Sequence, residues 1–276
     1  TKMEKCMSQL PEVRETDASA EIAAIYADIK ESAALPQVNL IFRHFATKPG
    51  VLAWIWQTLR PLYRSNELAA AADDLTRSIA RPGLSPLMAA LSGDDLADCK
   101  YVIDAYNSGN PQNLIALTAL VRVLEKPGRA EAAEPIVLTP REAFLSTDDA
   151  AAFPALPRRD ELETDMLARV ERMAARHPGA PGVVPSMYLH LALWPSALEA
   201  ADIYLQPMIE SPGWAPLVAS VVEQAGGIAQ EIAPGIELAP GPPDAATLEV
   251  VAGTIKAFIR QTIPELITVG RLLAVE

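Results

Sequence analysis

The sequence has little of several features that define whole classes of protein. Its two cysteines, Cys6 and Cys99, lack the spacing of a metal-binding or redox motif, so we expect reduced thiols and a cytoplasmic protein. The three histidines, His44, His177 and His190, show no metal-ligand spacing either. A glycine-rich nucleotide-binding motif, a P-loop and a credible Ser-His-Asp order are also missing. The sequence therefore predicts neither a metal nor a cofactor.

Positive charge and long apolar segments are also scarce. The chain has 23 Lys and Arg against 35 Asp and Glu, a formal net charge of −12. This balance argues against nucleic acid and anionic membranes as partners. No apolar run reaches the roughly 18 residues of a membrane span, and the first residues show no signal-peptide pattern. We expect a small-molecule ligand or substrate as the partner, and the sequence leaves a homodimer open.

What the sequence does have is apolar helical periodicity. Half of its residues are apolar but only 5% are aromatic, and no stretch alternates convincingly with period two. Apolar residues recur at i, i+4 and i+7 in both parts of the chain, as at Ile22, Tyr26 and Ile29 and again at Met166, Val170 and Met173. The pattern predicts an all-α fold.

The chain also contains an internal repeat. At an offset of 146 residues, the segment Phe42–Leu62 has six identities in 21 ungapped positions with Tyr188–Met208, including His44 with His190. Two copies are too few for an open solenoid, so we expect a pseudo-dimer of two tandem helical repeats with the site between them. The repeats are residues 1–125 and 153–276, and residues 126–152 form a long connector. A metal shared by the two symmetric histidines is conceivable, but the simpler interpretation is a locally hydrogen-bonded helix histidine in each repeat.

Proline and glycine predict where the helices begin and end. Pro36 is expected to open the helix that carries Phe42, and the segment 107–111 (NSGNP) is expected to interrupt an apolar helix. The C-terminal part predicts a pair of helices over 244–262 and 264–275.

Three segments resemble a known family. LPQVNLIFRHFATKPG, the later GNPQNLIALTAL and SMYLHLALWPSAL in the second repeat are similar to segments of the group I (D- and L-acting) 2-haloacid dehalogenases. The resemblance extends over nearly the whole chain. It implies an all-helical pseudo-dimer in which an aspartate activates water between the repeats. That water attacks Cα of the haloacid with inversion and without an ester intermediate.

The site residues that the resemblance implies match only in part. Asn110 and Ser186 stand where the family has an active-site asparagine and the serine before its catalytic aspartate, but Met187 stands in the place of that aspartate. Three expected aromatic positions are also changed. Gln37 replaces a tryptophan, Leu40 a phenylalanine and Ile255 a tyrosine. We expect these six residues to line one cavity between the repeats and to contact a ligand, with no catalytic residue assigned.

Two functions follow from this pattern. The first is a dehalogenase homologue that lacks the water-activating acid and binds, or differently transforms, a small organic ligand between the repeats. The alternative is an active hydrolytic dehalogenase of 2-haloalkanoic acids that uses another acid as its base. Asp104 and Asp202 are the candidates in the sequence for that base, although neither stands at the matching position.

Overall fold

The computed structural model describes residues 10–81, 83–125, 136–141, 152–177 and 183–275, and Cys6 lies outside them. Every regular element in these ranges is helical, apart from one isolated bridge between Ser65 and Pro140. This confirms the all-α fold. The first-half helices are α1 (Ala20–Ala33), α2 (Leu40–Phe45), α3 (Val51–Tyr63), α4 (Asn66–Ser78), α5 (Leu87–Ala90) and α6 (Gly93–Glu125), after a 3-10 turn η1 (Glu15–Asp17).

The second half continues with η3 (Arg159–Glu161), α8 (Thr164–Ala175), α9 (Ser186–Leu191), α10 (Pro195–Ile209), α11 (Trp214–Ile232), η4 (Ala233–Gly235), α12 (Ala245–Ala257), η5 (Phe258–Thr262) and α13 (Ile263–Leu273). None of the described helices is long and apolar enough to cross a membrane.

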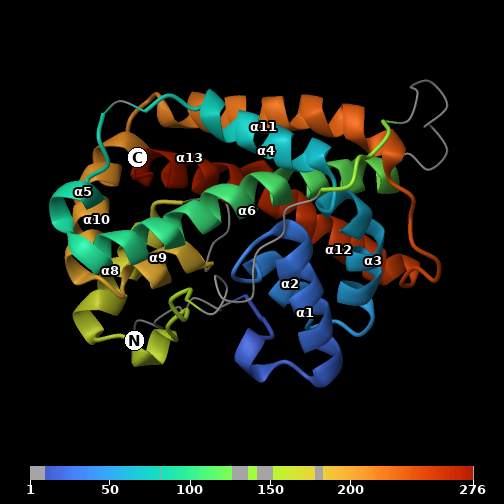
Figure 1. The fold of residues 1–276 in the computed structure, drawn as a ribbon, viewed down its shortest axis with the longest axis horizontal. Helices are drawn as coiled ribbons and strands as arrows, with labels where there is room; N and C mark the ends of the chain where they lie inside the picture. Colours follow the sequence, from blue (N-terminus) through green and yellow to red (C-terminus); the bar gives the residue numbers. More distant parts are fainter. Residues whose placement is uncertain (1–9, 82, 126–135, 142–151, 178–182, 276) are drawn as a thin grey trace, which may run out of the picture.

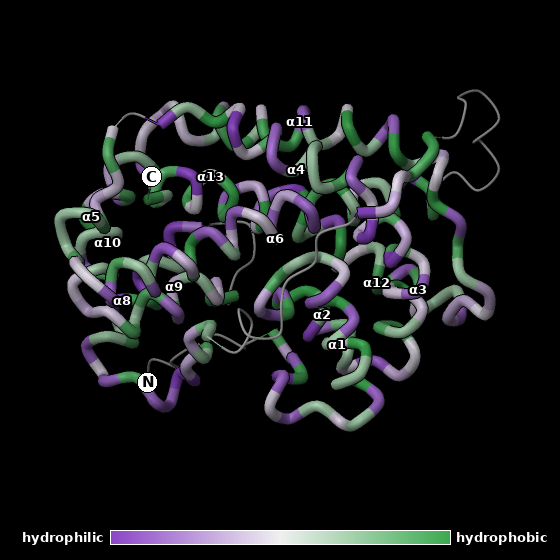
Figure 2. The backbone as a smooth tube through the Cα atoms, viewed as in Figure 1, coloured by the Kyte–Doolittle hydropathy of each residue, from purple (hydrophilic) through white to green (hydrophobic). Residues whose placement is uncertain are grey.

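Helix α6 is the axis of the molecule. Its 33 residues give it a length of about 50 Å. Helices α4, α11 and α13 pack along it, while α1–α3 lie towards one of its ends and α8–α10 towards the other (Figure 1). Hydrophilic as well as hydrophobic residues lie along this central helix (Figure 2). Nine consecutive residues, Gly109–Leu117, are buried, so this part of α6 is enclosed on all sides.

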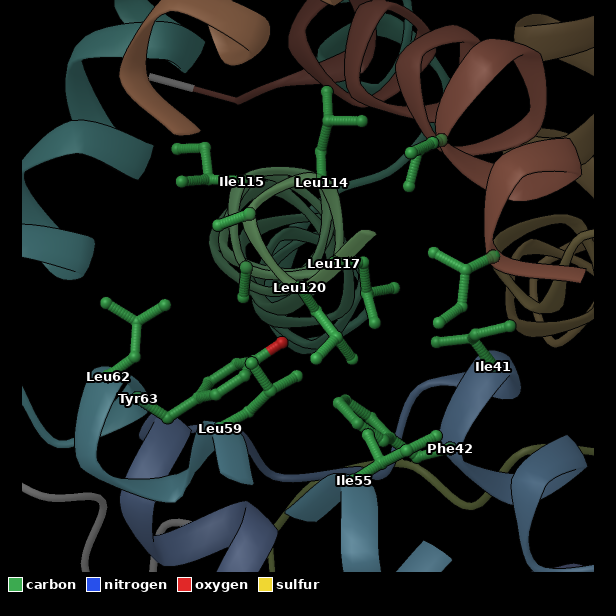
Figure 3. Close-up of a cluster of buried hydrophobic side chains, with 14 of the residues drawn as sticks. Ile41, Phe42, Ile55, Leu59, Leu62, Tyr63, Leu114, Ile115, Leu117 and Leu120 are labelled. Carbon is green, nitrogen blue, oxygen red and sulfur yellow. The ribbon is translucent and has the colours of Figure 1, made fainter. Parts of the chain in front are cut away.

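Two hydrophobic cores lie along α6, and both combine the two halves of the chain. Leu117 and Leu120 of its second part pack with α1–α4, α11 and α12, as with Phe42 and Tyr63 in Figure 3. Cys99, a buried free thiol, belongs to the other core, formed with α8–α10 and α13. The halves therefore interlock. Most of the expected connector, 126–152, lies outside the described residues, and the repeat boundaries stay a prediction.

The two copies of the internal repeat have the same local structure. Helices α2 and α9 each have six residues, and each is followed by a turn and by a longer helix, α3 or α10, that contains a proline. His44 Nδ1 lies 2.7 Å from Pro11 O, and His190 Nε2 lies 3.1 Å from Pro154 O. Both histidines thus bind the carbonyl of a proline that precedes the helices of their own half, as the local interpretation predicts. A two-fold relation between the whole halves stays a prediction.

Three predicted helix boundaries are wrong. Helix α2 begins at Leu40, not at Pro36, because the backbone of Asn39 before it is extended. Helix α6 continues without a break through 107–111. The two expected C-terminal helices are continuous, because the π-helical turn η5 joins α12 to α13. In that turn the Ile263 N–H bonds Phe258 O, five residues back, just before Pro264, which has no N–H to offer.

Candidate functional site

The middle of α6 has buried amide side chains on both sides of Pro111. Pro111 has no N–H for the carbonyl of Asn107, and the Thr76 hydroxyl, which donates to Ala72 O at 3.0 Å, shares its proton with that oxygen at 3.3 Å. A Cβ on Gly109 would lie 2.9 Å from Leu35 Cδ1 and 3.1 Å from Asn39 Oδ1. The shared hydrogen bond gives that carbonyl a donor, and the glycine lets the segment before α2 lie directly on the helix.

A small cavity lies beside this part of α6. Its volume is about 40 Å³, room for roughly three water molecules. Residues from α2, α6, α9 and the η5–α13 segment form its walls, namely Asn39, Leu40, Ile41, Tyr106, Asn110, Asn113, Val183, Pro185, Ser186, Phe258, Thr262, Ile263 and Leu266. We call it the inter-repeat cavity. It is mostly apolar, with a few amide and hydroxyl groups, which is the usual composition of a small-molecule site.

Two polar atoms in the wall of the inter-repeat cavity have no hydrogen-bond partner. They are Nδ2 of Asn110 and Oγ1 of Thr262, whose residues are 6% and 7% exposed. Asn39 Nδ2 donates to Asn110 Oδ1 at 3.4 Å, which leaves the Asn110 amide nitrogen free. Because an unpaired buried polar group costs about 1–3 kcal/mol, these two atoms favour a polar ligand in the cavity.

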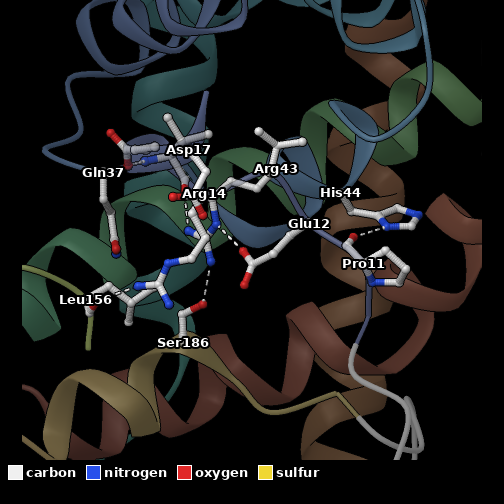
Figure 4. Close-up of polar contacts among 12 residues, drawn as sticks. Pro11, Glu12, Arg14, Asp17, Gln37, Arg43, His44, Leu156 and Ser186 are labelled. Carbon is white, nitrogen blue, oxygen red and sulfur yellow. Dashed lines mark hydrogen bonds and ion pairs between the residues drawn. The ribbon is translucent and has the colours of Figure 1, made fainter. Parts of the chain in front are cut away.

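A buried arginine, Arg43, hydrogen-bonds Ser186 in the wall of the inter-repeat cavity. Arg43 forms an ion pair with Glu12 at 2.5 Å and donates from Nη2 to Ser186 Oγ at 3.0 Å (Figure 4). It also donates to Val38 O at 2.5 Å. Ser186 accepts from Arg43 and also hydrogen-bonds the Tyr106 hydroxyl, so its hydroxyl belongs to the same network. The contact with Arg43 joins helix α2 to helix α9.

Tyr106 and His190 extend this polar network. His190 Nε2 must donate to Pro154 O, so Nδ1 is the acceptor for the Tyr106 hydroxyl at 2.7 Å. Burial lowers the pKa of His190 to about 4, which keeps the ring neutral near pH 7. Gln37 Oε1 lies 3.4 Å from the same tyrosine hydroxyl. The network fixes the histidine in one tautomer and places the tyrosine at the cavity wall.

The structure brings three of the six sequence-predicted site residues together. Leu40, Asn110 and Ser186 line the inter-repeat cavity, whereas Gln37 lines a separate cavity next to Arg43. Met187, at the start of α9, turns the opposite way from Ser186 and is fully buried in the second core. A Cβ on Gly270 of α13 would lie 3.2 Å from its Cε. The expectation that all six line one cavity is wrong for Gln37, Met187 and Ile255, and the ligand-binding roles stay a prediction.

Ile255, which the resemblance placed at the site, does not reach the inter-repeat cavity. It is fully buried in the first core, while Phe258, Thr262, Ile263 and Leu266 line the cavity. The position of Ile255 rested on the resemblance alone, and the π-helical turn η5 begins only after it, at Phe258.

Neither acid proposed as a substitute base lies at the cavity. Asp104 is half-exposed on α6 and pairs with Lys100. Asp202 is buried on α10, where it pairs with Arg176 and lies 3.7 Å from Arg169. Both carboxylates are held in ion pairs, and neither lines the inter-repeat cavity.

A different buried carboxylate lies close to the inter-repeat cavity. Glu265 Oε2 is 3.1 Å from His177 Nδ1, and the other ring nitrogen of His177 is 2.6 Å from the Tyr188 hydroxyl. Glu265, His177 and Thr262 border a void of about 10 Å³, which is close to the volume of one water molecule. The void and the inter-repeat cavity share four wall residues, Val183, Pro185, Thr262 and Leu266. His177 and Glu265 are 88 positions apart, so no local motif pointed to them.

Within the described ranges, no three His, Cys, Asp or Glu side chains gather as a metal site would require. No protein-family model matches the chain. A solved structure of a D-2-haloacid dehalogenase mutant superposes with a TM-score of 0.80 and 18% identity, over 96% of this chain and 94% of that one. The complex of D-2-haloacid dehalogenase with L-LA gives 0.79 and 19%, over 96% and 95%. The fold is therefore that of the D-2-haloacid dehalogenases.

Sequence comparison adds homology to this shared fold. The chain is 28% identical over 211 residues to a configuration-inverting 2-haloacid dehalogenase of Alcaligenes xylosoxydans xylosoxydans, covering 72% of this chain and 69% of that protein. It is 24% identical over 222 residues to an (R)-2-haloacid dehalogenase of Pseudomonas putida, covering 76% and 72%. This chain is thus a homologue of the configuration-inverting 2-haloacid dehalogenases.

Proposed function

We propose that this protein binds a small organic acid of the 2-substituted alkanoate type in the inter-repeat cavity. The observation that carries the proposal is the pair of unpaired polar atoms, Asn110 Nδ2 and Thr262 Oγ1, in the wall of one buried cavity. A carboxylate or hydroxyl group of the ligand supplies the partner that each atom lacks. The homologues act on 2-haloacids by name, which gives the chemical class of ligand.

The cavity walls agree with such a ligand in size and polarity. About 40 Å³ holds only a few heavy atoms, and Leu40, Phe258 and Ile263 provide an apolar surface for an alkyl or halogen group. The positive charge of Arg43 is one hydroxyl away from the cavity, through Ser186. An acid ligand would therefore meet donors on two sides and apolar groups elsewhere.

In this proposal the protein does not activate water as the resemblance implies. Met187 occupies the aspartate position, and a thioether neither holds a proton nor orients a water molecule well. Its side chain is also directed into the second core and away from the cavity. The primary function is therefore binding, or a transformation that needs no base at this position.

Hydrolytic dehalogenation is the second candidate, and Glu265 is the specific observation in its favour. The void beside Glu265 and His177 has the volume of one water molecule and borders the inter-repeat cavity at Thr262. A water molecule there could pass its proton to Glu265 while attacking Cα of a haloacid bound next to Asn110, with halide as the leaving group. In this mechanism Glu265 takes the role of base that the sequence suggested for Asp104 or Asp202.

Ligand binding to paired variants tests the primary proposal. We expect 2-chloropropionate or lactate to bind the wild-type protein in calorimetry, and Asn110→Ala to weaken binding about tenfold through loss of a hydrogen bond to a charged ligand. Thr262→Val keeps the shape of the side chain and removes its hydroxyl, so it should weaken binding by a smaller factor. Thr118→Val on the same central helix α6 is the matched control, because its hydroxyl bonds Leu114 O and Thr118 does not line the cavity. Equal affinities in all four proteins would refute the site.

A further inference from the structure

A second and larger cavity lies on the other side of the Arg43 network. Its volume is about 200 Å³, and it is lined by Arg14, Glu15, Thr16, Pro36, Gln37, Arg43, Phe153, Pro154, Ala155, Leu156 and His190. Segments from both halves of the chain form it, as the positions of Arg14, Gln37 and Leu156 in Figure 4 show. We call it the Arg14 cavity.

Arg14 is the cation in this cavity that the protein leaves uncompensated. Among the described residues its guanidinium donates one hydrogen bond, at 2.5 Å to Leu156 O, and has no carboxylate within ion-pair distance. The other charged groups in the wall are already paired. Glu15 binds Lys30 at 2.9 Å and the Val38 N–H at 2.8 Å, and Arg43 binds Glu12. Over the wall of this cavity and its ion-pair partners, one positive charge has no counter-ion, and four of the five Arg14 N–H donors have no acceptor among the described residues. Glu12, Asp17 and Asp160 line an adjacent cavity with Arg14 but lie beyond ion-pair distance.

Much of the remaining wall is apolar. Phe153, Pro154 and Leu156 line the cavity, as does Pro36. The Phe153 ring packs edge-on against His190 and against Tyr101, each at a centroid distance of 5.2 Å. An unpaired guanidinium beside rigid apolar side chains is suited to a ligand that has an anionic head and a short apolar body.

We propose that the Arg14 cavity is a second binding site, distinct from the inter-repeat cavity, for a small organic carboxylate held by the Arg14 guanidinium with its alkyl part on Phe153, Pro154 and Leu156. Arginine binds a carboxylate through two parallel N–H···O bonds, and the four nitrogen-bound hydrogens not used for Leu156 O provide that geometry. The volume of this cavity is five times that of the inter-repeat cavity, so it accepts larger acids.

The two cavities share one polar wall. Gln37 and His190 face the Arg14 cavity, and both contact the hydroxyl of Tyr106, which faces the inter-repeat cavity. Arg43 lines the Arg14 cavity and donates a hydrogen bond to Ser186, which lines the inter-repeat cavity. A carboxylate on Arg14 would also weaken the positive field that Arg14 and Arg43 exert on His190. Occupancy of one cavity is therefore expected to change the affinity of the other, and the change must be reciprocal.

Titration of the intact protein with isobutyrate, inorganic phosphate and chloride tests the site. Isobutyrate has a carboxylate and a branched apolar body but no 2-halo or 2-hydroxy group. We expect it to bind the wild-type protein, with Arg14→Gln at least tenfold weaker because a charge-assisted bond is lost. Arg158→Gln is the matched control. It removes an equal charge nearby, but Arg158 is exposed, pairs with Asp17 and does not line this cavity.

Each further outcome decides the proposal. Isobutyrate affinity should fall further in Arg14→Gln than in Thr262→Val, which separates this site from the inter-repeat cavity, and an equal or larger loss in Thr262→Val would overturn the second site. If Arg14→Gln does not fold, Arg14→Lys is the substitute. It keeps the positive charge without the paired N–H donors of the guanidinium, and it should bind isobutyrate between three- and tenfold more weakly than the wild type. Equal loss in Arg14→Gln and Arg158→Gln would show a general charge effect and overturn the site. Phosphate or chloride binding as tightly as isobutyrate would overturn its assignment to organic carboxylates.

Discussion

Arg43 Nη2 donates to Ser186 Oγ at 3.0 Å, and this hydrogen bond joins helix α2 to helix α9. Arg43 lies on α2 and Ser186 is the first residue of α9. The arginine side chain is only 4% exposed, and that of its ion-pair partner Glu12 is 12% exposed. One buried cation therefore links the N-terminal segment at Glu12 to both helices.

Arg43→Gln should be strongly destabilising. The substitution leaves the Glu12 carboxylate in a mostly buried position without its cation, and breaking a buried ion pair costs about 3–5 kcal/mol. We expect the free energy of unfolding, measured in urea, to fall by about that amount.

The double variant Glu12→Gln/Arg43→Gln should lose much less stability than the sum of the two single variants. Removal of both charges leaves no uncompensated ion. A strictly additive cycle would show that the two side chains do not interact in solution. Arg158→Gln, at an exposed ion pair with Asp17, is the control and should change stability by less than about 1 kcal/mol.

The sequence was informative where local pattern decides structure. The echo between Phe42–Leu62 and Tyr188–Met208 correctly indicated two similar helix–turn–helix segments, since equal apolar spacing produces equal helices. It was misleading at Pro111, where helix breaking was the local expectation. Tertiary packing overrides that expectation: the segment 109–117 is buried on all sides, and the Thr76 hydroxyl on α4 shares its proton between Ala72 O and the carbonyl that Pro111 leaves without a donor. The residues around Pro111 in the sequence give no signal of this contact with α4.

The candidate site was predictable only in part for the same reason. Asn110 and Ser186 were found because they stand in motifs, and both reach the inter-repeat cavity. Met187 stands in a motif as well, but adjacent residues at a helix start point in different directions. The Glu265–His177 pair and the uncompensated Arg14 depend on long-range packing, so neither had a local signal.

Met187→Asp should damage the fold more than it restores a catalytic base. The Met187 side chain is fully buried among apolar residues of the second core and packs against Gly270 on α13. A carboxylate there is desolvated without a cation, so its pKa would rise and the group would tend to be neutral. We expect a loss of about 3–5 kcal/mol in the free energy of unfolding and no gain of halide release.

Met187→Leu is the control for volume and should cost less than about 1.5 kcal/mol. Thermal and urea unfolding measure both changes. A stable Met187→Asp protein would mean that water reaches this position, and halide release by it would show that the resemblance to the dehalogenases extends to the orientation of the side chain.

His190 should make the protein less stable as the pH falls below neutrality. Its pKa is about 4 in the folded protein, against about 6.5 in an unfolded chain, so only the unfolded chain binds the extra proton between these values. The stabilisation is complete above pH 6.5 and is lost as the pH falls to 4, a total of about 3 kcal/mol. The slope should be visible between pH 7 and pH 5 in urea titrations.

His190→Gln should flatten that slope. Glutamine keeps one donor for Pro154 O and one acceptor for Tyr106 but has no group that titrates in this range. The variant will be less stable than the wild type at pH 7, and the difference should shrink towards pH 5. Parallel curves for the two proteins would show that His190 is not the group responsible.

The wild-type protein should not release halide from 2-chloropropionate of either hand faster than a control without enzyme. Attack of neutral water on a secondary carbon is slow, and a positioned base contributes about 10²–10⁴-fold through proton abstraction alone. Met187 offers no such base, and both Asp104 and Asp202 are held in ion pairs away from the cavity. Among the described residues, Glu265 is the carboxylate that lines the void next to the inter-repeat cavity, and its oxygens already accept from Gln261 and contact His177. Halide release that disappears in Glu265→Gln, but survives in the control Asp104→Asn, would establish the hydrolytic alternative and identify its base. Absence of release in all three proteins, together with ligand binding at Asn110, is the result that we expect.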